Sequence, residues 1–255
     1  MTTQLSLIAL SHLPDVQPGD DLPALILAAL AEAGLTLQAG DVLAIAQKIV
    51  SKAEGRLVDL TTVTPGPEAL RVAAQTDKDP RQVELILRES EEISRLKKGV
   101  LIVRHRLGFV SANAGIDRSN VQQAATGEWV LLLPRDPDNS AESIRQALQA
   151  QSGVPLGVII TDSHGRPFRL GTVGVALGVA GIPALWDRRG EPDLYGYRLQ
   201  HTDVGVADEI AAAAGLLMGQ AAEGTPVVLV RGLQLPPRLG RASDLIRPKD
   251  QDLYR

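Results

Sequence analysis

The chain contains no cysteine, which excludes disulfides, thiolate metal ligands and cysteine nucleophiles. Aromatic residues make up only 3% of its 255 residues, against 44% for all hydrophobic types, so the core must be mainly aliphatic and layered α/β structure is favoured. The net charge of −4 offers no basic field to nucleic acid. No apolar run reaches the roughly 18 residues that a membrane-spanning helix needs. These absences predict a cytoplasmic protein that binds neither nucleic acid nor membranes.

Hydrophobic periodicity and chain breakers predict alternating strands and helices. Apolar runs predict strands over 4–10, 41–50, 129–134, 154–163 and 225–233, the second of which continues into a helix or loop. Apolar residues at helical spacing predict helices over 22–34, 139–153 (with an N-cap serine, Ser140) and 206–220, and a long charged helix over 81–98 that ends at Gly99. Residues 100–115 are typical of a hairpin that turns at Leu107–Gly108. The predicted domain covers 1–235, and 236–255 form an arm or tail.

Polar residues gather where apolar strands end, and Lys48 and Lys52 form the first such group. They lie four residues apart, so a helix would place both ammonium groups on one face, where they repel unless an anion lies between them. A solvated surface face is the simpler interpretation. Their position directly after a buried strand favours a ligand site, because α/β folds bind ligands there.

Two further groups combine an aspartate with neutral oxygens. Asp117 is followed by Ser119 and Asn120, and Asp162 is followed by Ser163. Either aspartate alone is typical of a turn or a helix cap. Two such segments in one chain make a site for Mg²⁺ or Mn²⁺ an equal alternative, because these ions prefer carboxylate and other hard oxygen ligands.

The remaining motifs exclude several classes of site. The segment 219–225 could bring backbone N–H groups to an anion, although a helix C-cap explains Gly219 equally well. No GxxxxGK[ST] run is present, and LGTVGVALG lacks the Rossmann spacing. Ser163 has no GxSxG context, which disfavours a serine hydrolase. His105 and His201 are interpreted as structural, whereas His164 is placed near the site by its neighbour Asp162.

Five segments carry a resemblance to one family. They are GDVLAIAQKIVSKAEGRLVDL, GFVSANAGIDRSNV, LLLPRDPDNSAESIRQAL, VIITDSHGRPFRLGTVGVALGVAGIPAL and EGTPVVLVRG. In this order they resemble the coenzyme F420-0:L-glutamate ligase family, in its standalone form, from about Leu10 to Leu233. The resemblance implies that GTP phosphorylates the terminal carboxylate of F420-0, and that the amine of L-glutamate then displaces phosphate. Further γ-linked glutamates follow, with GDP released in each round.

The resemblance also implies the site. Asp117 and Asp162 would be catalytic, and one or two divalent ions would be held by Asp117, Asp162, Ser163 and Gln220. The expected GTP contacts are Leu13, Pro14, Asp15, Val16, Lys48, Lys52, Asn120, Met218, Gly219, Gln220, Ala221, Ala222, Glu223, Gly224 and Thr225. Cations are required there because phosphoryl transfer onto a carboxylate brings negative charges together.

The implied fold is α/β with two intertwined lobes, neither Rossmann nor P-loop, in a homodimer. The chain departs from the family pattern at Ser111, where relatives often have cysteine, and at Gln220, whose amide replaces what could be a charged metal ligand. Two alternatives remain open: the same chemistry on a variant deazaflavin tail, and an inactive relative that binds a nucleotide or deazaflavin.

Overall fold

A computed structural model describes residues 4–11, 13–123 and 127–252 of the chain. Its centre is a five-stranded sheet with the order β1-β12-β2-β8-β9. These strands are β1 (Ser6–Leu10), β2 (Val42–Ala46), β8 (Gly157–Arg166), β9 (Arg169–Ala180) and β12 (Val227–Arg231). The pair β2–β8 is parallel and the other pairs are antiparallel, so this mixed sheet differs from a parallel doubly wound sheet. The predicted α/β class is confirmed.

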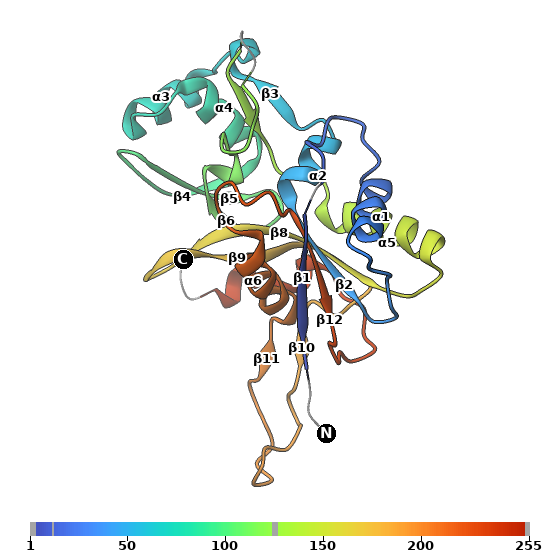
Figure 1. Cartoon of the computed structure of the whole chain (residues 1–255). Helices are drawn as coiled ribbons and strands as arrows, with labels where there is room; N and C mark the ends of the chain where they lie inside the picture. Colours follow the sequence, from blue (N-terminus) through green and yellow to red (C-terminus); the bar gives the residue numbers. More distant parts are fainter. Residues whose placement is uncertain (1–3, 12, 124–126, 253–255) are drawn as a thin grey trace.

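Helices cover both faces of this sheet (Figure 1). On one face α1 (Leu22–Glu32), α2 (Gln47–Ala53) and α5 (Pro137–Ser152) pack on an aliphatic cluster that includes Leu43, Ile45 and Ile160. On the other face α6 (Val206–Met218) packs against Val42, Ala44 and Val228. Consecutive strand residues are buried on both faces, which is why these strands appear in the sequence as nearly continuous apolar runs.

A third hydrophobic cluster lies apart from the central sheet. It contains residues of α3 (Pro67–Thr76), α4 (Pro80–Arg88) and β5 (Val100–His105), such as Val72, Ile86 and Leu101. Strands β4 (Ser90–Lys97), β5 and β6 (Val110–Ala112) form a three-stranded sheet, and β3 (Leu57–Asp59) pairs with β7 (Trp129–Leu131). A last pair, β10 (Trp186–Asp187) and β11 (Asp203–Val204), leads into a hairpin that projects from the molecule (Figure 1).

Two sequence predictions are wrong in this region. The charged segment 81–98 is not one helix, because α4 ends at Arg88 and Ser90–Lys97 pairs with β5 across a two-residue turn, Lys98–Gly99. Ser140 does not cap α5, since the helix begins at Pro137 and the Asp136 carboxylate accepts the Asn139 N–H. The other predicted strands and helices, and the hairpin over 100–115, are confirmed to within a few residues. Of the predicted tail, residues 236–252 contain only two short 3₁₀ turns, Ala242–Leu245 and Lys249–Gln251.

Candidate active site

The segments that follow β1, β2 and β8 and the segment that precedes β12 meet at one edge of the central sheet, where these strands end or begin. Strands β2 and β8 are parallel, so the residues after Ala46 and after Thr161 leave the sheet side by side. Strand β12 is antiparallel to β2 and begins at Val227, which places segment 219–226 beside them. Strand β1 is antiparallel to β12 and ends at Leu10, so residues 13–16 follow at this edge too. Sequence segments that are far apart therefore meet because of strand order alone.

A cavity of about 1040 Å³ opens at this edge, and it is called the main cavity below. All the residues that the resemblance assigned to GTP, to metal and to catalysis line it. Ser119, named beside Asp117 as a candidate oxygen ligand, lines it too, together with residues that the sequence did not single out for a site: Ala46, Gln47, Ile49, Val121, Gln122, Thr161, Thr172, Gly174, Gly215 and Pro226. Gln122 adjoins the Asp117 motif, whereas Thr172 and Gly174 reach the cavity through the pairing of β9 with β8, which spacing in the sequence does not reveal.

Lys48 contacts the Asp117 segment across the cavity. Helix α2 starts directly after β2, which puts Lys48 in its first turn. The Lys48 ammonium lies 2.6 Å from Asp117 Oδ2, and it also donates hydrogen bonds to the Ser119 hydroxyl and backbone carbonyl. Burial raises the pKa of Asp117, but the Lys48 ammonium and the Ser119 N–H and hydroxyl outweigh it, so the pKa lies below its usual value. Asp117 is therefore an ionised acceptor at neutral pH.

Lys52 has a different acidic partner. Its ammonium lies 2.7 Å from Asp15 Oδ1, in the segment that follows β1, and its side chain is only 13% exposed. The repulsion expected between two lysines on one helical face is thus relieved by carboxylates of the chain itself. Both lysines line the main cavity, so neither is an ordinary solvated surface residue. An anionic ligand would compete with Asp15 and Asp117 for the two ammonium groups.

The segment before Asp117 explains how this aspartate is placed. Asn113, Ala114 and Gly115 all have positive φ, and Ala114 is fully buried in the third hydrophobic cluster. Gly115 has φ +67°, and a Cβ there would lie 2.8 Å from a methyl carbon of Leu133, so a larger residue would be strained and would have to displace this buried side chain. The turn brings Asp117 beside Leu131, with which it exchanges two backbone hydrogen bonds of 3.1 and 2.9 Å.

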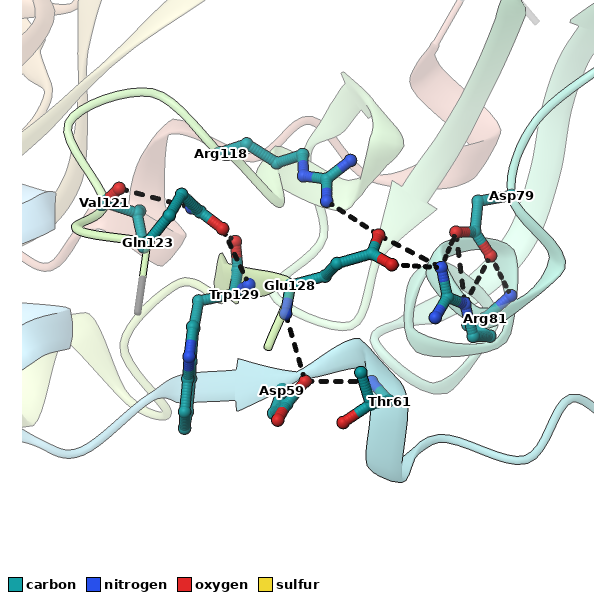
Figure 2. A network of polar contacts seen from close by, with 9 residues as sticks. All are labelled: Asp59, Thr61, Asp79, Arg81, Arg118, Val121, Gln123, Glu128 and Trp129. Carbon is teal, nitrogen blue, oxygen red and sulfur yellow. Dashed lines mark hydrogen bonds and ion pairs between the residues drawn. The ribbon is translucent and has the colours of Figure 1, made fainter. Parts of the chain in front are cut away.

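An ion-pair network holds the chain after Asp117. Figure 2 shows Glu128 between two arginines, with Arg118 on one side and Arg81 of α4 on the other. Both ion pairs measure 3.1 Å, and Arg81 is paired in addition with Asp79. The carboxylates of Asp79 and Glu128 raise the pKa of Arg81 further, so this guanidinium stays charged over the whole physiological range. The network connects the Asp117 segment to α4.

Asp162 and Ser163 reach the cavity from β8. They pair with Val175 and Gly174 of β9. A Cβ at Gly174 would lie 2.4 Å from the carbonyl oxygen of Ala211, so this glycine allows α6 to pack directly on β9. The Asp162 carboxylate lies 3.3 Å from Nε2 of His164, a residue that does not line the main cavity.

The segment after α6, residues 219–226, forms another wall of the main cavity. Gly219 caps α6, which confirms that the helix ends there. The Glu223 carboxylate accepts the N–H of Ala221 at 2.8 Å, which together with neighbouring N–H groups lowers the pKa of Glu223. The Asn120 side chain donates to the Ala221 carbonyl at 3.0 Å. This bond joins the Asp117 segment to the 219–225 segment.

The donor atoms in the main cavity suit a hard divalent cation. Asp117, Asp162, Ser163 and Gln220 supply carboxylate, hydroxyl and amide oxygens to one space. Within the described part of the chain, no group of three or more Asp, Glu, His or Cys residues is arranged to hold a metal. Such an ion would therefore keep water or substrate oxygens in its shell, which is typical of Mg²⁺ at phosphate-transfer sites.

One protein family matches most of the chain. Residues 11–232 match the family described as F420-0:Gamma-glutamyl ligase. The chain is 51% identical over 253 residues to the coenzyme F420:L-glutamate ligase of Methanothermobacter thermautotrophicus, covering 98% of this chain and 99% of the relative. The chain belongs to the F420-0:gamma-glutamyl ligase family.

Two other relatives with the same name extend the comparison. The protein of Methanopyrus kandleri is 51% identical over 94% of this chain and 93% of its own length. That of Methanocaldococcus jannaschii is 46% identical over 86% of each chain. The family match includes every segment that lines the main cavity, from Leu13 to Pro226. Among the described residues, no helix has the length and apolar character needed to span a bilayer.

Proposed function

We propose that this protein uses GTP to join L-glutamate to the terminal carboxylate of coenzyme F420-0, and then adds further glutamates through γ-links. The observation that carries the proposal is the convergence of two lysines, two aspartates and the 219–225 backbone on one cavity of about 1040 Å³. A cavity of this size fits a nucleotide together with part of a second substrate. The printed names of the relatives support the choice of acceptor and amino acid.

A carboxylate does not react directly with an amine, because an oxide ion is a poor leaving group. In the proposed reaction a carboxylate oxygen of F420-0 attacks the γ-phosphorus of GTP, and the bond from that phosphorus to the β–γ bridging oxygen breaks. The products are GDP and an acyl phosphate. The neutral amine of L-glutamate then attacks the acyl carbon, inorganic phosphate leaves with its electron pair, and the amine proton passes to solvent or phosphate. No covalent bond to the enzyme is needed.

The residues of the main cavity would act by positioning and by charge. Lys48 and Lys52 would bind phosphate oxygens as they exchange their present partners, Asp117 and Asp15, for the nucleotide. Asp117, Asp162, Ser163 and Gln220 would hold one or two divalent ions, Mg²⁺ or Mn²⁺. Such ions neutralise charge that develops on the phosphoryl group. The 219–225 segment would contact the nucleotide through backbone N–H groups.

The test is a reconstituted reaction followed by mass spectrometry. Purified protein is incubated with F420-0 labelled with ¹⁸O in its terminal carboxylate, L-glutamate, GTP and Mg²⁺ or Mn²⁺, with EDTA and ATP arms as controls. The expected products are glutamylated F420, GDP and phosphate that contains one ¹⁸O atom. Unlabelled phosphate would refute the acyl-phosphate route. Nucleotide binding without product would favour the inactive relative, and reaction only with an altered deazaflavin tail would favour the variant acceptor.

We also propose a homodimer. Two projecting segments carry exposed apolar side chains: Phe168 and Leu170, 96% and 97% exposed at the β8–β9 turn, and Leu194, Tyr195 and Tyr197 in the β10–β11 hairpin. Apolar groups that extend from the body of a protein are typical of association surfaces. Sedimentation equilibrium of the wild type should give twice the chain mass, and Phe168→Ser with Leu170→Ser should shift it toward the monomer. A monomeric wild type at micromolar concentration would refute the dimer.

A further inference from the structure

We propose that His164 is a positioning residue that holds the Asp162 carboxylate in the orientation required in the main cavity. This inference rests on the proposed function, in which Asp162 binds a divalent cation. Residues two apart on a strand point to the same face, so Asp162 and His164 of β8 are neighbours. His164 Nε2 lies 3.3 Å from Asp162 Oδ2, with side chains only 11% and 19% exposed.

The imidazole nitrogen that faces Asp162 needs a partner. His164 Nε2 is fully buried and forms no hydrogen bond with the described residues. A buried N–H group without an acceptor is unfavourable, and most are satisfied in folded proteins. Asp162 Oδ2 is already within hydrogen-bonding distance but is not aligned with the N–H direction. In the proposed arrangement the carboxylate turns so that Oδ2 accepts this N–H, and Oδ1 remains available to a cation in the main cavity, which Asp162 lines.

The histidine ring also packs against an aromatic side chain. Phe109 packs against it with ring centres 5.0 Å apart, and Phe109 in turn stacks in parallel on His105, also at 5.0 Å. His105 is fully buried, and its Nδ1 accepts the N–H of Leu107 at 3.0 Å. The turn between β5 and β6 therefore limits the movement of His164. A fixed donor beside a candidate ligand is the arrangement by which groups outside the ligand shell orient metal-binding carboxylates.

Asp208 of α6 is the competing partner for His164. Both residues line a second cavity of about 260 Å³, which shares no lining residue with the main cavity. The Asp208 Oδ1 atom is already engaged by the N–H of Ala176 at 2.8 Å, and burial raises the pKa of this carboxyl group. Asp162 is the acid that lies within ion-pair distance of Nε2. These contacts favour Asp162 as the group that His164 orients.

The test measures Mn²⁺ binding by electron paramagnetic resonance in the protein without substrates. His164→Leu removes the donor but keeps an apolar contact for Phe109, whereas His164→Gln keeps an N–H at the same reach. His164→Leu should raise the Kd for Mn²⁺ by about 10- to 100-fold, and His164→Gln should stay within about threefold of the wild type. Thermal unfolding of each variant verifies the fold.

Two matched variants separate positioning from general damage. His201→Gln changes an exposed histidine that lines neither cavity, and Asp208→Asn alters the competing acid. Both should leave the Kd for Mn²⁺ unchanged. The inference is overturned if His164→Leu binds Mn²⁺ as well as the wild type, if His164→Gln is as defective as His164→Leu, or if Asp208→Asn reproduces the loss.

The inference and the proposed function can fail separately. A wild-type protein that glutamylates F420-0 but binds no Mn²⁺ on its own would overturn the role of His164 and leave the ligase proposal standing. A wild-type protein that binds Mn²⁺ with the expected dependence on His164 but forms no glutamylated product would refute the ligase proposal alone.

Discussion

The Lys48 ammonium lies 2.6 Å from the Asp117 carboxylate. This ion pair joins α2, which directly follows strand β2 of the central sheet, to the Asp117 segment, whose residues Ala114 and Ile116 belong to the third hydrophobic cluster. The pair lies in the wall of the main cavity and is only partly exposed. Within the pair the two charges neutralise each other, although the proposed reaction needs Lys48 to bind phosphate and Asp117 to bind a cation. Substrate binding therefore has to separate the pair, and substitutions of either member should affect binding more than folding.

Replacing Asp117 with asparagine should abolish most turnover while the fold is retained. Asparagine keeps an oxygen that accepts the Ser119 N–H, but it lacks the negative charge that would hold a cation. We expect the rate of GDP release to fall by about 100-fold or more, a loss typical for a group that stabilises transition-state charge. Single-turnover kinetics measure it, and far-ultraviolet circular dichroism verifies the fold. A variant that retains wild-type turnover would contradict the role of Asp117.

Replacing Lys52 with methionine should weaken nucleotide binding more than it slows chemistry. The apolar part of the side chain is preserved, while the ammonium that would bind phosphate is lost. The KM for GTP should rise by about tenfold, equivalent to roughly 1.4 kcal/mol. Lys98→Met is the matched control, because Lys98 is exposed and paired with Asp77 away from the main cavity. Equal effects of the two substitutions on KM would show that Lys52 has no specific role.

A methyl group at position 174 should destabilise the protein, because of the 2.4 Å approach to the Ala211 carbonyl described above. Gly174→Ala should cost about 1–3 kcal/mol by overpacking, which lowers the unfolding midpoint by about 2–4 °C for each kcal/mol. Gly165→Ala, on the neighbouring strand, provides the control, since its Cβ would have nothing within 4 Å. Equal melting temperatures for the two variants would mean that α6 can move away from β9 without cost.

The segments that line the main cavity could be predicted from the sequence, whereas the ion pairs that connect these segments could not. Buried strands could be recognised from apolar runs, and their ends pointed to residues 48, 117 and 162. The motifs also carried the family resemblance, which the comparisons confirm. The ion pairs of Lys48 with Asp117 and of Lys52 with Asp15 could not be predicted, because they depend on strand order and on partners that are 69 and 37 residues distant in the chain.

There is a physical reason why the helix predicted over 81–98 does not form as one helix. Charged residues that favour helices occur throughout it, and the two apolar residues after Ser90, Ile93 and Leu96, are three apart, which is compatible with a helix. Lys98–Gly99 is a two-residue hairpin turn, with Gly99 at φ 77°, and the apolar strand Val100–His105 follows at once. Pairing with that strand overrides the local helix preference of Ser90–Lys97. The turn signal was present in the sequence, whereas the pairing that makes it decisive depends on tertiary structure.

Glu89 should make the stability of the protein depend on acid pH. Its carboxylate is buried next to His105, accepts hydrogen bonds from Arg56 and Arg106 at 3.0 Å, and is 12% exposed. Burial opposes ionisation of Glu89, but His105 and the two arginines outweigh it and lower the pKa from 4.5 to about 2. Because the folded state has the lower pKa, Glu89 stabilises the protein fully above about pH 4.5, and this contribution is lost as the pH falls toward 2.

Urea unfolding of Glu89→Gln at two pH values tests this directly. At pH 7 the variant should lose about 3 kcal/mol of unfolding free energy, from a shift of about 2.5 pKa units at 1.36 kcal/mol each. Near pH 3 the difference from the wild type should be clearly smaller, because the Glu89 carboxyl is then mostly protonated in the unfolded state, and ionising it on folding offsets part of the stabilisation. Glu68→Gln, which changes an exposed carboxylate paired with Arg71, should leave the urea midpoint unchanged at both pH values. A pH-independent loss in Glu89→Gln would mean that packing, not charge, accounts for the contribution of Glu89.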